Sequence, residues 1–193
     1  MYPFFETVRI EGRRIHNRIW HNRRLNRTIY DRFGIRSDYD IADYIDLPSD
    51  DGLYRCKLLY GPAIGAVTLT PYRRRRYRSL QCIDAEISYS YKSTDRSAID
   101  ALFSRRGESD DIIIVRDGLL TDTSIANIAL FDGLHWYTPE VPLLEGTMRA
   151  SLIDAGLLRT RRIDRGFLRK STEFALLNAM TGLYQLKNII LKF

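Results

Sequence analysis

The chain has 193 residues, of which 45% are hydrophobic and 28% charged, with a net charge of +6. This balance excludes an intrinsically disordered chain and is typical of a folded domain with a real core. No run of about 18 apolar residues occurs, which excludes a membrane-spanning helix. The opening residues show no signal-peptide pattern, so we expect a cytoplasmic protein. Cys56 and Cys82 are widely spaced and form no metal-binding pattern, so we expect reduced, buried thiols and no metal.

The first half of the chain predicts strands around one long helix. Alternating apolar residues predict a strand over 4–10, in which Glu6 shares the apolar face and is expected to point into the fold. Asn17 and Gly34 predict the start and the end of the first helix. In chain order, the predicted elements are strand 4–10, a short strand after Gly12, helix 18–33, helix 38–45, and strands 53–59, 66–71 and 81–89.

Short strands and tight turns dominate the second half. Asp117-Gly118 and Asp132-Gly133 are strong hairpin signals. The predicted elements are helix 95–104, strands 111–116, 119–123, 125–131 and 136–138, helix 147–155, and strands 173–179 and 183–191. Short strands interleaved with isolated helices indicate an α+β fold. The rise in hairpin density indicates a small N-terminal α/β lobe over 1–80 and a larger C-terminal lobe over 81–193.

Lys92 is the leading candidate for a catalytic amine among only five lysines. It follows an alternating stretch, 87–91, that looks like a strand, and it precedes a predicted helix start at Thr94-Asp95. Such a junction places a side chain in a cleft, where a neutral amine can act as a nucleophile. Lys57 is the main competitor, although a lone lysine within a strand is usually a solvated surface residue. Lys170, Lys187 and Lys192 lie in a basic run or near the C-terminus.

Two further segments carry polar groups next to apolar elements. Asp122 lies at the edge of a strand that is expected to be buried, and a buried carboxylate needs a positive partner. A protonated pyridine nitrogen would be such a partner. Gly146-Thr147 begins a predicted helix, whose free backbone N–H groups suit a phosphate. Without further context, the segment around Asp122 is also consistent with a polar turn, and Gly146-Thr147 with an ordinary helix start.

Together and in this order, these motifs resemble the class IV aminotransferase family, the fold-type IV enzymes that use pyridoxal 5'-phosphate (PLP). The matching segments are Phe4 to Arg9, His21 to Leu25, Lys92 with Arg96, Thr121 to Ile128, Thr138-Pro139, Leu144 to Arg149, and Asn178-Ala179-Met180. The last of these resembles the corresponding block of aminodeoxychorismate lyases. The resemblance covers most of the chain, and it implies a two-lobed fold like that of the D-amino-acid and branched-chain aminotransferases.

The resemblance also implies roles for individual residues. Lys92 would hold PLP covalently and move the proton of the substrate Cα. Asp122 would pair with the pyridine nitrogen. The phosphate would be held by Arg24, Gly146, Thr147, Asn178 and Ala179; a guanidinium such as that of Arg24 matches a phosphate well.

Three features depart from the family pattern. Asp122 stands where the family usually has Glu, so its carboxylate is one methylene shorter. Family members usually begin earlier, with an extra strand, so the resemblance implies a truncated N-terminal small lobe. The stretch from Tyr72 to Lys92 is also short, which implies a reshaped substrate pocket.

Two reactions and one unrelated function follow from these observations. The favoured reaction is that of a PLP-dependent lyase, which converts 4-amino-4-deoxychorismate to 4-aminobenzoate and pyruvate for folate synthesis. The alternative is an aminotransferase acting on branched-chain or D-amino acids. The arginine-rich run 71–78 would steer a small anionic, amino-acid-like substrate, or it is a solvated loop. Together with its tyrosines, this run also resembles a segment that binds nucleic acid, so a non-enzymatic nucleic-acid-binding protein is the alternative outside the enzymes. No nucleic-acid or membrane partner is nevertheless expected.

By analogy with the family we expect a homodimer. A degenerate family member that binds PLP weakly is a further alternative.

Overall fold

A computed structural model describes residues 2–193, which form two compact units. Unit 1 comprises the residues up to Arg74 together with Tyr91–Asp95. Unit 2 comprises Arg75–Ser90 and Arg96–Phe193. The polypeptide therefore enters unit 2, returns to unit 1 for five residues that include Lys92, and then completes unit 2.

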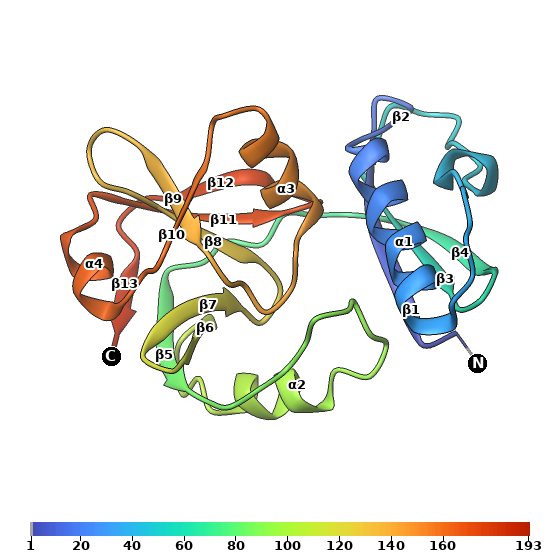
Figure 1. The fold of residues 1–193 in the computed structure, drawn as a ribbon. Coiled ribbons are helices and arrows are strands. Elements are labelled where there is room, and N and C mark those ends of the chain that lie inside the picture. The colour runs from blue at the N-terminus through green and yellow to red at the C-terminus, as the bar shows by residue number, and fades with distance from the viewer. Residues whose placement is uncertain (1) are drawn as a thin grey trace. The chain divides into compact units, whose positions relative to one another are not determined.

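Unit 1 is a four-stranded sheet with a helix on one face (Figure 1). Its elements are β1 (Phe4–Glu11), β2 (Arg14–Ile15), α1 (Arg18–Phe33), the 3-10 helix η1 (Ile41–Tyr44), β3 (Tyr54–Tyr60) and β4 (Ile64–Pro71). The strand order is β2-β1-β3-β4, and all pairs are antiparallel. Alternate residues of β1 are buried, as the sequence predicts, and Val8 packs in one core with Leu25 and Ile29 of α1.

Two local predictions in unit 1 need correction. Asn17 stands at the N-terminus of α1, but its backbone is left-handed (φ 59°), and its side chain accepts no capping bond from any described residue. The predicted helix over 38–45 is only the 3-10 turn η1, because the Asp40 side chain accepts a hydrogen bond from the N–H of Ala42 and stabilises a tight turn. Gly34 ends α1 as predicted, with φ 69°.

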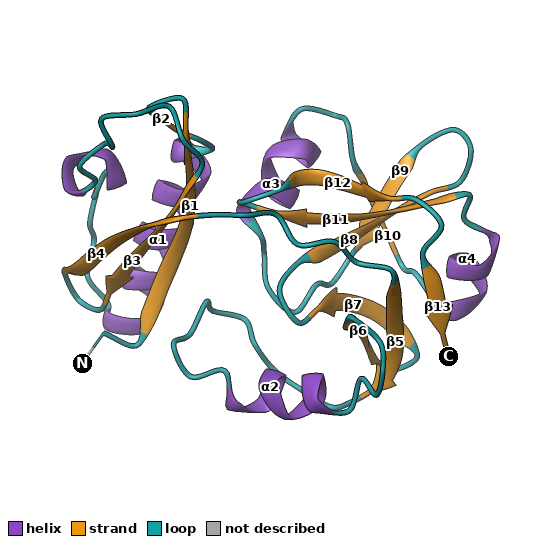
Figure 2. Ribbon diagram, turned by 180° about the vertical axis from the view of Figure 1, so that it is seen from behind, coloured by secondary structure: helices purple, strands orange, loops and turns teal. Residues whose placement is uncertain are grey.

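Unit 2 is a nine-stranded sheet with short helices around it (Figure 2). Its elements are β5 (Ser79–Asp84), α2 (Ser97–Ser104), β6 (Asp111–Arg116), β7 (Leu119–Thr123), β8 (Asn127–Phe131), β9 (Trp136–Pro139), α3 (Thr147–Asp154), β10 (Arg159–Arg161), α4 (Arg165–Lys170), β11 (Glu173–Asn178), β12 (Gly182–Leu186) and β13 (Ile190–Lys192).

The sheet of unit 2 mixes parallel and antiparallel pairs. The path β10-β9-β8-β7-β6-β5-β13 is parallel at β9–β10, β5–β6 and β5–β13, whereas β11 pairs antiparallel with both β8 and β12. The β6–β7 hairpin turns at Asp117 (φ 51°) and Gly118 (φ 75°), as predicted. The α+β prediction is confirmed. No helix within residues 2–193 combines the length and apolar character needed to cross a membrane.

Several element boundaries in unit 2 differ from the predictions. The predicted strand 81–89 ends at Asp84, because Ile87 and Tyr89 alternate onto a small apolar cluster without entering a ladder. The helix predicted to start at Thr94-Asp95 begins at Ser97. The predicted strand 183–191 divides into β12 and β13. β10 and α4 were not predicted, since a three-residue exposed strand and a six-residue helix show too little periodicity.

Candidate functional site

Asp122 is the centre of a buried hydrogen-bond network in unit 2. It is only 4% exposed, and its carboxylate accepts hydrogen bonds from the Asn127 side-chain amide at 2.7 Å and from the Leu144 backbone N–H at 2.9 Å. The same Asn127 amide donates to the Leu144 carbonyl at 2.8 Å. The antiparallel pairing of β7 with β8 places Asp122 opposite Asn127. The sequence 122–127 therefore folds back on itself to fix the carboxylate.

The electrostatics of Asp122 suit a cationic partner that is not a side chain. Burial raises the pKa of the Asp122 carboxyl to about 6, although its two hydrogen bonds and the charge of Arg149 lower it. Among the described residues, no basic side chain forms an ion pair with Asp122. A protonated ring nitrogen at this position would favour the ionised carboxylate and remove the cost of burying it.

Gly146 brings the start of α3 against this network. Its backbone is extended (φ −70°, ψ 142°), and a Cβ added there would lie 2.0 Å from the Asn127 side-chain oxygen. Thr147, the first residue of α3, is 4% exposed. Only glycine therefore lets the helix start approach Asn127 so closely, and the first turn of α3 offers N–H groups that suit an anion.

If the chain binds PLP as the resemblance implies, Gly146→Ala is expected to weaken that binding about tenfold or more, because Asn127 must move and give up its hydrogen bond to the Asp122 carboxylate or to the Leu144 carbonyl. The measurement is the PLP dissociation constant by fluorescence titration. Asn127→Ala removes the atom that the new methyl group would strike. If the clash is the cause, Gly146→Ala adds little in an Asn127→Ala background; full additivity would contradict it.

The predicted phosphate segment 178–179 ends β11 beside the same network. Leu177 pairs with Asn127 across β11 and β8, so Asn178 follows directly on this contact. The Asn178 side-chain oxygen accepts hydrogen bonds from the backbone N–H groups of Met180 and Thr181, at 3.0 Å each. Its side chain therefore shapes the turn into β12. Asp122 and Gly146 therefore lie against Asn127, and the other predicted residues of unit 2 follow these contacts along the chain: Thr147 after Gly146, and Asn178 and Ala179 after Leu177.

Lys92 and Arg24, the other predicted residues, both lie in unit 1. The Lys92 backbone carbonyl accepts a hydrogen bond from the Phe5 N–H at 3.0 Å, and its Nζ lies 4.8 Å from the centroid of the Phe5 ring. The segment that contains Lys92 thus pairs with the start of β1 rather than ending a strand of its own. Lys57 on β3 is exposed and lies on the same ring, with its Nζ 5.1 Å from the centroid. Both candidate amines therefore lie over Phe5.

Arg24 forms a buried ion pair on the opposite face of β1. Its Nε donates to Glu6 at 2.8 Å, and the Nδ1 of His21 lies 2.6 Å from the same carboxylate. Glu6 and His21 are fully buried, and Arg24 is 8% exposed. Burial acts to raise the pKa of Glu6, but the Arg24 charge and the contacts with His21 lower it to about 2. The ion pair with Glu6 therefore fixes the orientation of the Arg24 guanidinium.

Glu6→Gln is expected to destabilise the protein by about 3–5 kcal/mol at neutral pH, because it removes the carboxylate charge that faces the buried Arg24 guanidinium. The native pKa of Glu6 lies below its ordinary value of 4.5, so its contribution is complete above that pH and is lost as the pH falls toward 2. Urea unfolding at several pH values measures this difference.

Arg18→Ala is the matched control, since it breaks the exposed Arg18–Asp40 pair and is expected to have a far smaller effect. Two outcomes would contradict a stabilising buried pair. The first is an equal loss of unfolding free energy in the two variants at neutral pH. The second is a difference in unfolding free energy between wild type and Glu6→Gln that does not shrink in acid.

Sequence reasoning missed the partners that hold these residues. Asn127 was part of a recognised motif but had no role, and its bond to Asp122 depends on the turn that joins β7 to β8. The pairing of Glu6 with Arg24 had a readable signal, because His21 and Arg24 lie three residues apart on one helix and Glu6 lies on a buried strand face. Arg96 was also recognised without a role; its guanidinium donates to the Ser124 carbonyl at 2.8 Å and holds that turn.

Comparisons with known proteins identify a family and several similar structures. A sequence profile described as amino-transferase class IV matches residues 66–189. An uncharacterized protein of Haemophilus influenzae is 37% identical over 188 residues, which are 95% of this chain and 100% of that protein. A crystal structure from Haemophilus somnus, described as a "putative 4-amino-4-deoxychorismate lyase", is 32% identical with a TM-score of 0.89, covering 95% of this chain and 98% of that one. A "hypothetical aminotransferase" of Mycobacterium tuberculosis in its PLP-bound form has 18% identity and a TM-score of 0.78, covering 98% of this chain and 81% of that one.

Proposed function

Because the chain belongs to the class IV aminotransferase family, whose enzymes depend on PLP, we propose that it is a PLP-dependent lyase. In the proposed reaction, 4-amino-4-deoxychorismate is converted to 4-aminobenzoate and pyruvate. The PLP assignment rests on the buried hydrogen-bond network of Asp122. Its carboxylate forms no ion pair with a basic side chain among the described residues. It also lies beside the start of α3, where Gly146 precedes the first helical residue.

The residues present fit the cofactor. Asp122 would pair with the ring nitrogen, held in place by Asn127 and the Leu144 N–H. Gly146, Thr147 and the 178–179 turn would supply backbone donors for the phosphate, and Arg24 would add a charge that Glu6 orients. Lys92 would form the covalent link. When bound, PLP supplies an electron sink that stabilises negative charge at the substrate Cα.

The protein residues would then handle the substrate proton. Lys92 would take the proton from the substrate Cα as a neutral amine and return it later in the reaction. The Phe5 ring covers one side of this amine, which limits its contact with water. Asp122 would stay ionised opposite the ring nitrogen and keep that nitrogen protonated. These roles are shared by the lyase and the aminotransferase.

The lyase is favoured over the aminotransferase because this chain is similar to a structure described as a lyase over nearly the full length of both chains. The Haemophilus somnus structure described as a lyase is matched over 98% of its length at 32% identity. The structure described as an aminotransferase is matched at 18% identity, which carries the fold alone. An aminotransferase acting on branched-chain or D-amino acids is the second candidate. A homodimer and a small anionic, amino-acid-like substrate stay predictions.

A direct assay separates the two reactions. The purified, PLP-loaded protein is incubated with 4-amino-4-deoxychorismate and no keto acid, and 4-aminobenzoate is measured. The lyase proposal expects 4-aminobenzoate and pyruvate in equal amounts. Amino transfer that requires a keto acid, with no 4-aminobenzoate formed, would show that the aminotransferase is the correct function.

A further inference from the structure

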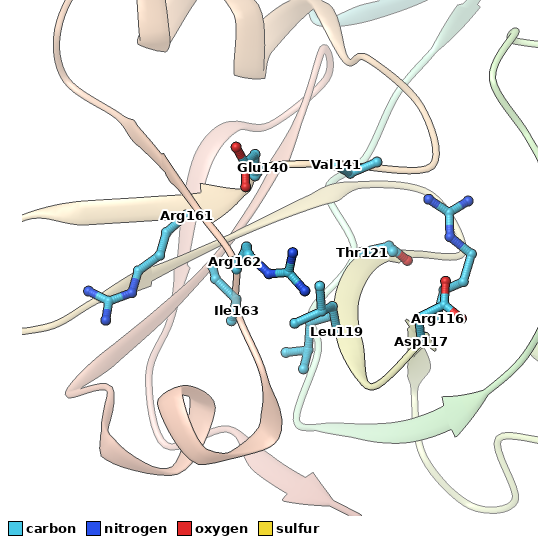
Figure 3. Close-up of a pocket in the computed structure, with 10 residues that line it drawn as sticks. Arg116, Asp117, Leu119, Thr121, Glu140, Val141, Arg161, Arg162 and Ile163 are labelled. Carbon is cyan, nitrogen blue, oxygen red and sulfur yellow. The ribbon is translucent and has the colours of Figure 1, made fainter.

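Unit 2 contains a small pocket, of about 260 Å³, that is made by residues outside the proposed cofactor site. It lies between the β6–β7 hairpin, the start of the loop after β9, and the end of β10 (Figure 3). The lining residues are Arg116, Asp117, Leu119, Leu120, Thr121, Glu140, Val141, Arg161, Arg162 and Ile163. A pocket of this size suits a small molecule rather than a peptide or a large cofactor.

The pocket combines an apolar floor with charged walls. Leu120 and Ile163 are each 1% exposed, and Leu119 and Val141 add further apolar surface. Three arginines and two carboxylates line the walls, and the guanidinium of one of the arginines, Arg161, turns away from the pocket. Such a lining matches a ligand that has an apolar body and one negative group.

Arg162 is the residue best placed to bind that negative group. Its side chain extends toward Leu119, whereas the neighbouring Arg161 points the other way (Figure 3). The Arg161 guanidinium instead lies 4.5 Å from the centroid of the Phe167 ring. Within residues 2–193, Arg162 has no hydrogen bond, ion pair or ring contact. Arg116, on the far side of the pocket, donates to the Ile87 carbonyl at 3.3 Å and is thereby anchored.

We propose that this pocket binds a small monocarboxylate with an apolar body, whose carboxylate pairs with Arg162 while its body packs on Leu119 and Val141. A planar guanidinium binds a carboxylate through two parallel hydrogen bonds. An apolar ligand body that covers the floor removes apolar surface from water, which favours binding. The proposal is independent of the reaction proposed above, because none of the residues assigned to PLP lines the pocket.

Benzoate is a suitable probe, titrated into the full-length, PLP-loaded protein and followed by ¹H–¹⁵N NMR. We expect saturable shifts of the backbone amides of Leu119, Thr121, Val141 and Ile163. Benzamide and benzylamine have the same ring without the negative charge, and each is expected to bind at least tenfold more weakly. Arg162→Ala is expected to weaken benzoate binding tenfold or more.

Arg159→Ala is the matched control, since Arg159 is an exposed arginine of β10, three residues before Arg162, that does not line the pocket. It is expected to leave benzoate affinity within twofold of wild type. The proposal is overturned if these amides show no saturable shift, or if benzylamine or benzamide binds as tightly as benzoate. Equal losses in Arg162→Ala and Arg159→Ala, or no loss in Arg162→Ala, would overturn it as well.

Discussion

Replacing Lys92 with alanine is expected to lower turnover by about 10³-fold or more and to abolish covalent attachment of PLP. The reason is that, in the proposed function, one amine would serve both as the covalent link and as the base for the substrate proton. The half-buried position of Lys92 beside Phe5 makes the side chain dispensable for the fold, so the variant is expected to unfold like wild type. Turnover and borohydride-stable incorporation of PLP are the measurements.

Lys57→Ala is the control that the structure itself supplies. Its Nζ is 5.1 Å from the Phe5 ring centroid, against 4.8 Å for Lys92, so both amines share the same neighbour. Lys57 is an exposed strand residue, and its loss is expected to change turnover less than about twofold. Loss of activity in Lys57→Ala with retention in Lys92→Ala would reverse the assignment of the two lysines.

Replacing Asp122 with asparagine is expected to lower turnover by about 10²-fold or more, because a neutral amide cannot keep the pyridine nitrogen protonated. It is also expected to weaken PLP binding, since the amide replaces one of the two acceptor oxygens used by Asn127 and Leu144. The measurements are steady-state turnover and the PLP dissociation constant. Turnover and affinity within twofold of wild type would remove Asp122 from the site.

The pH dependence of stability provides a second readout for Asp122. Its pKa in the folded, cofactor-free protein is about 6, against an ordinary 3.8, so the folded state favours the protonated form. The resulting contribution to stability is present below pH 3.8 and is lost as the pH rises through 6, a change of about 3 kcal/mol. PLP bound through its ring nitrogen is expected to reverse this trend, which unfolding with and without PLP measures.

Asp111→Asn is the matched control for Asp122→Asn, because Asp111 is a buried aspartate with no proposed role at the cofactor. Asp111 is 1% exposed on β6, burial raises its pKa, and its carboxylate accepts from the backbone N–H groups of Ile112 and Ser124. Asparagine keeps the oxygen that accepts both hydrogen bonds, so the replacement is expected to leave the PLP dissociation constant within about threefold. A loss of PLP affinity as large as that of Asp122→Asn would mean that any buried charge change disturbs the site.

Local sequence signals predicted most of the fold. The period-2 burial of β1 and the limits of α1, from Arg18 to Phe33, follow from apolar spacing and from Gly34. The same reasoning failed at 85–90, since an extended segment that half-buries Ile87 and Tyr89 shows the alternation of a strand without its hydrogen bonds. Alternation reports burial on one side, whereas a ladder requires a neighbouring strand.

The sequence predicted a set of candidate site residues but not the network that links them. The motif order identified Asp122 and Gly146, yet nothing in the sequence shows that Asn127 binds the first and would collide with a side chain on the second. Likewise, Lys92 was predicted to follow a strand, but its position depends on pairing with the start of β1, almost ninety residues earlier. Such long-range contacts depend on tertiary packing, which local propensity does not encode.

Peptide mapping after borohydride reduction tests the central assignment most directly. The PLP-loaded protein is reduced, digested and analysed by mass spectrometry to locate the pyridoxyl group. We expect a single modified lysine, Lys92, with its peptide carrying the full label. A label on Lys57 or on any other lysine, or reduced protein that carries no label after saturation with PLP, would contradict the account.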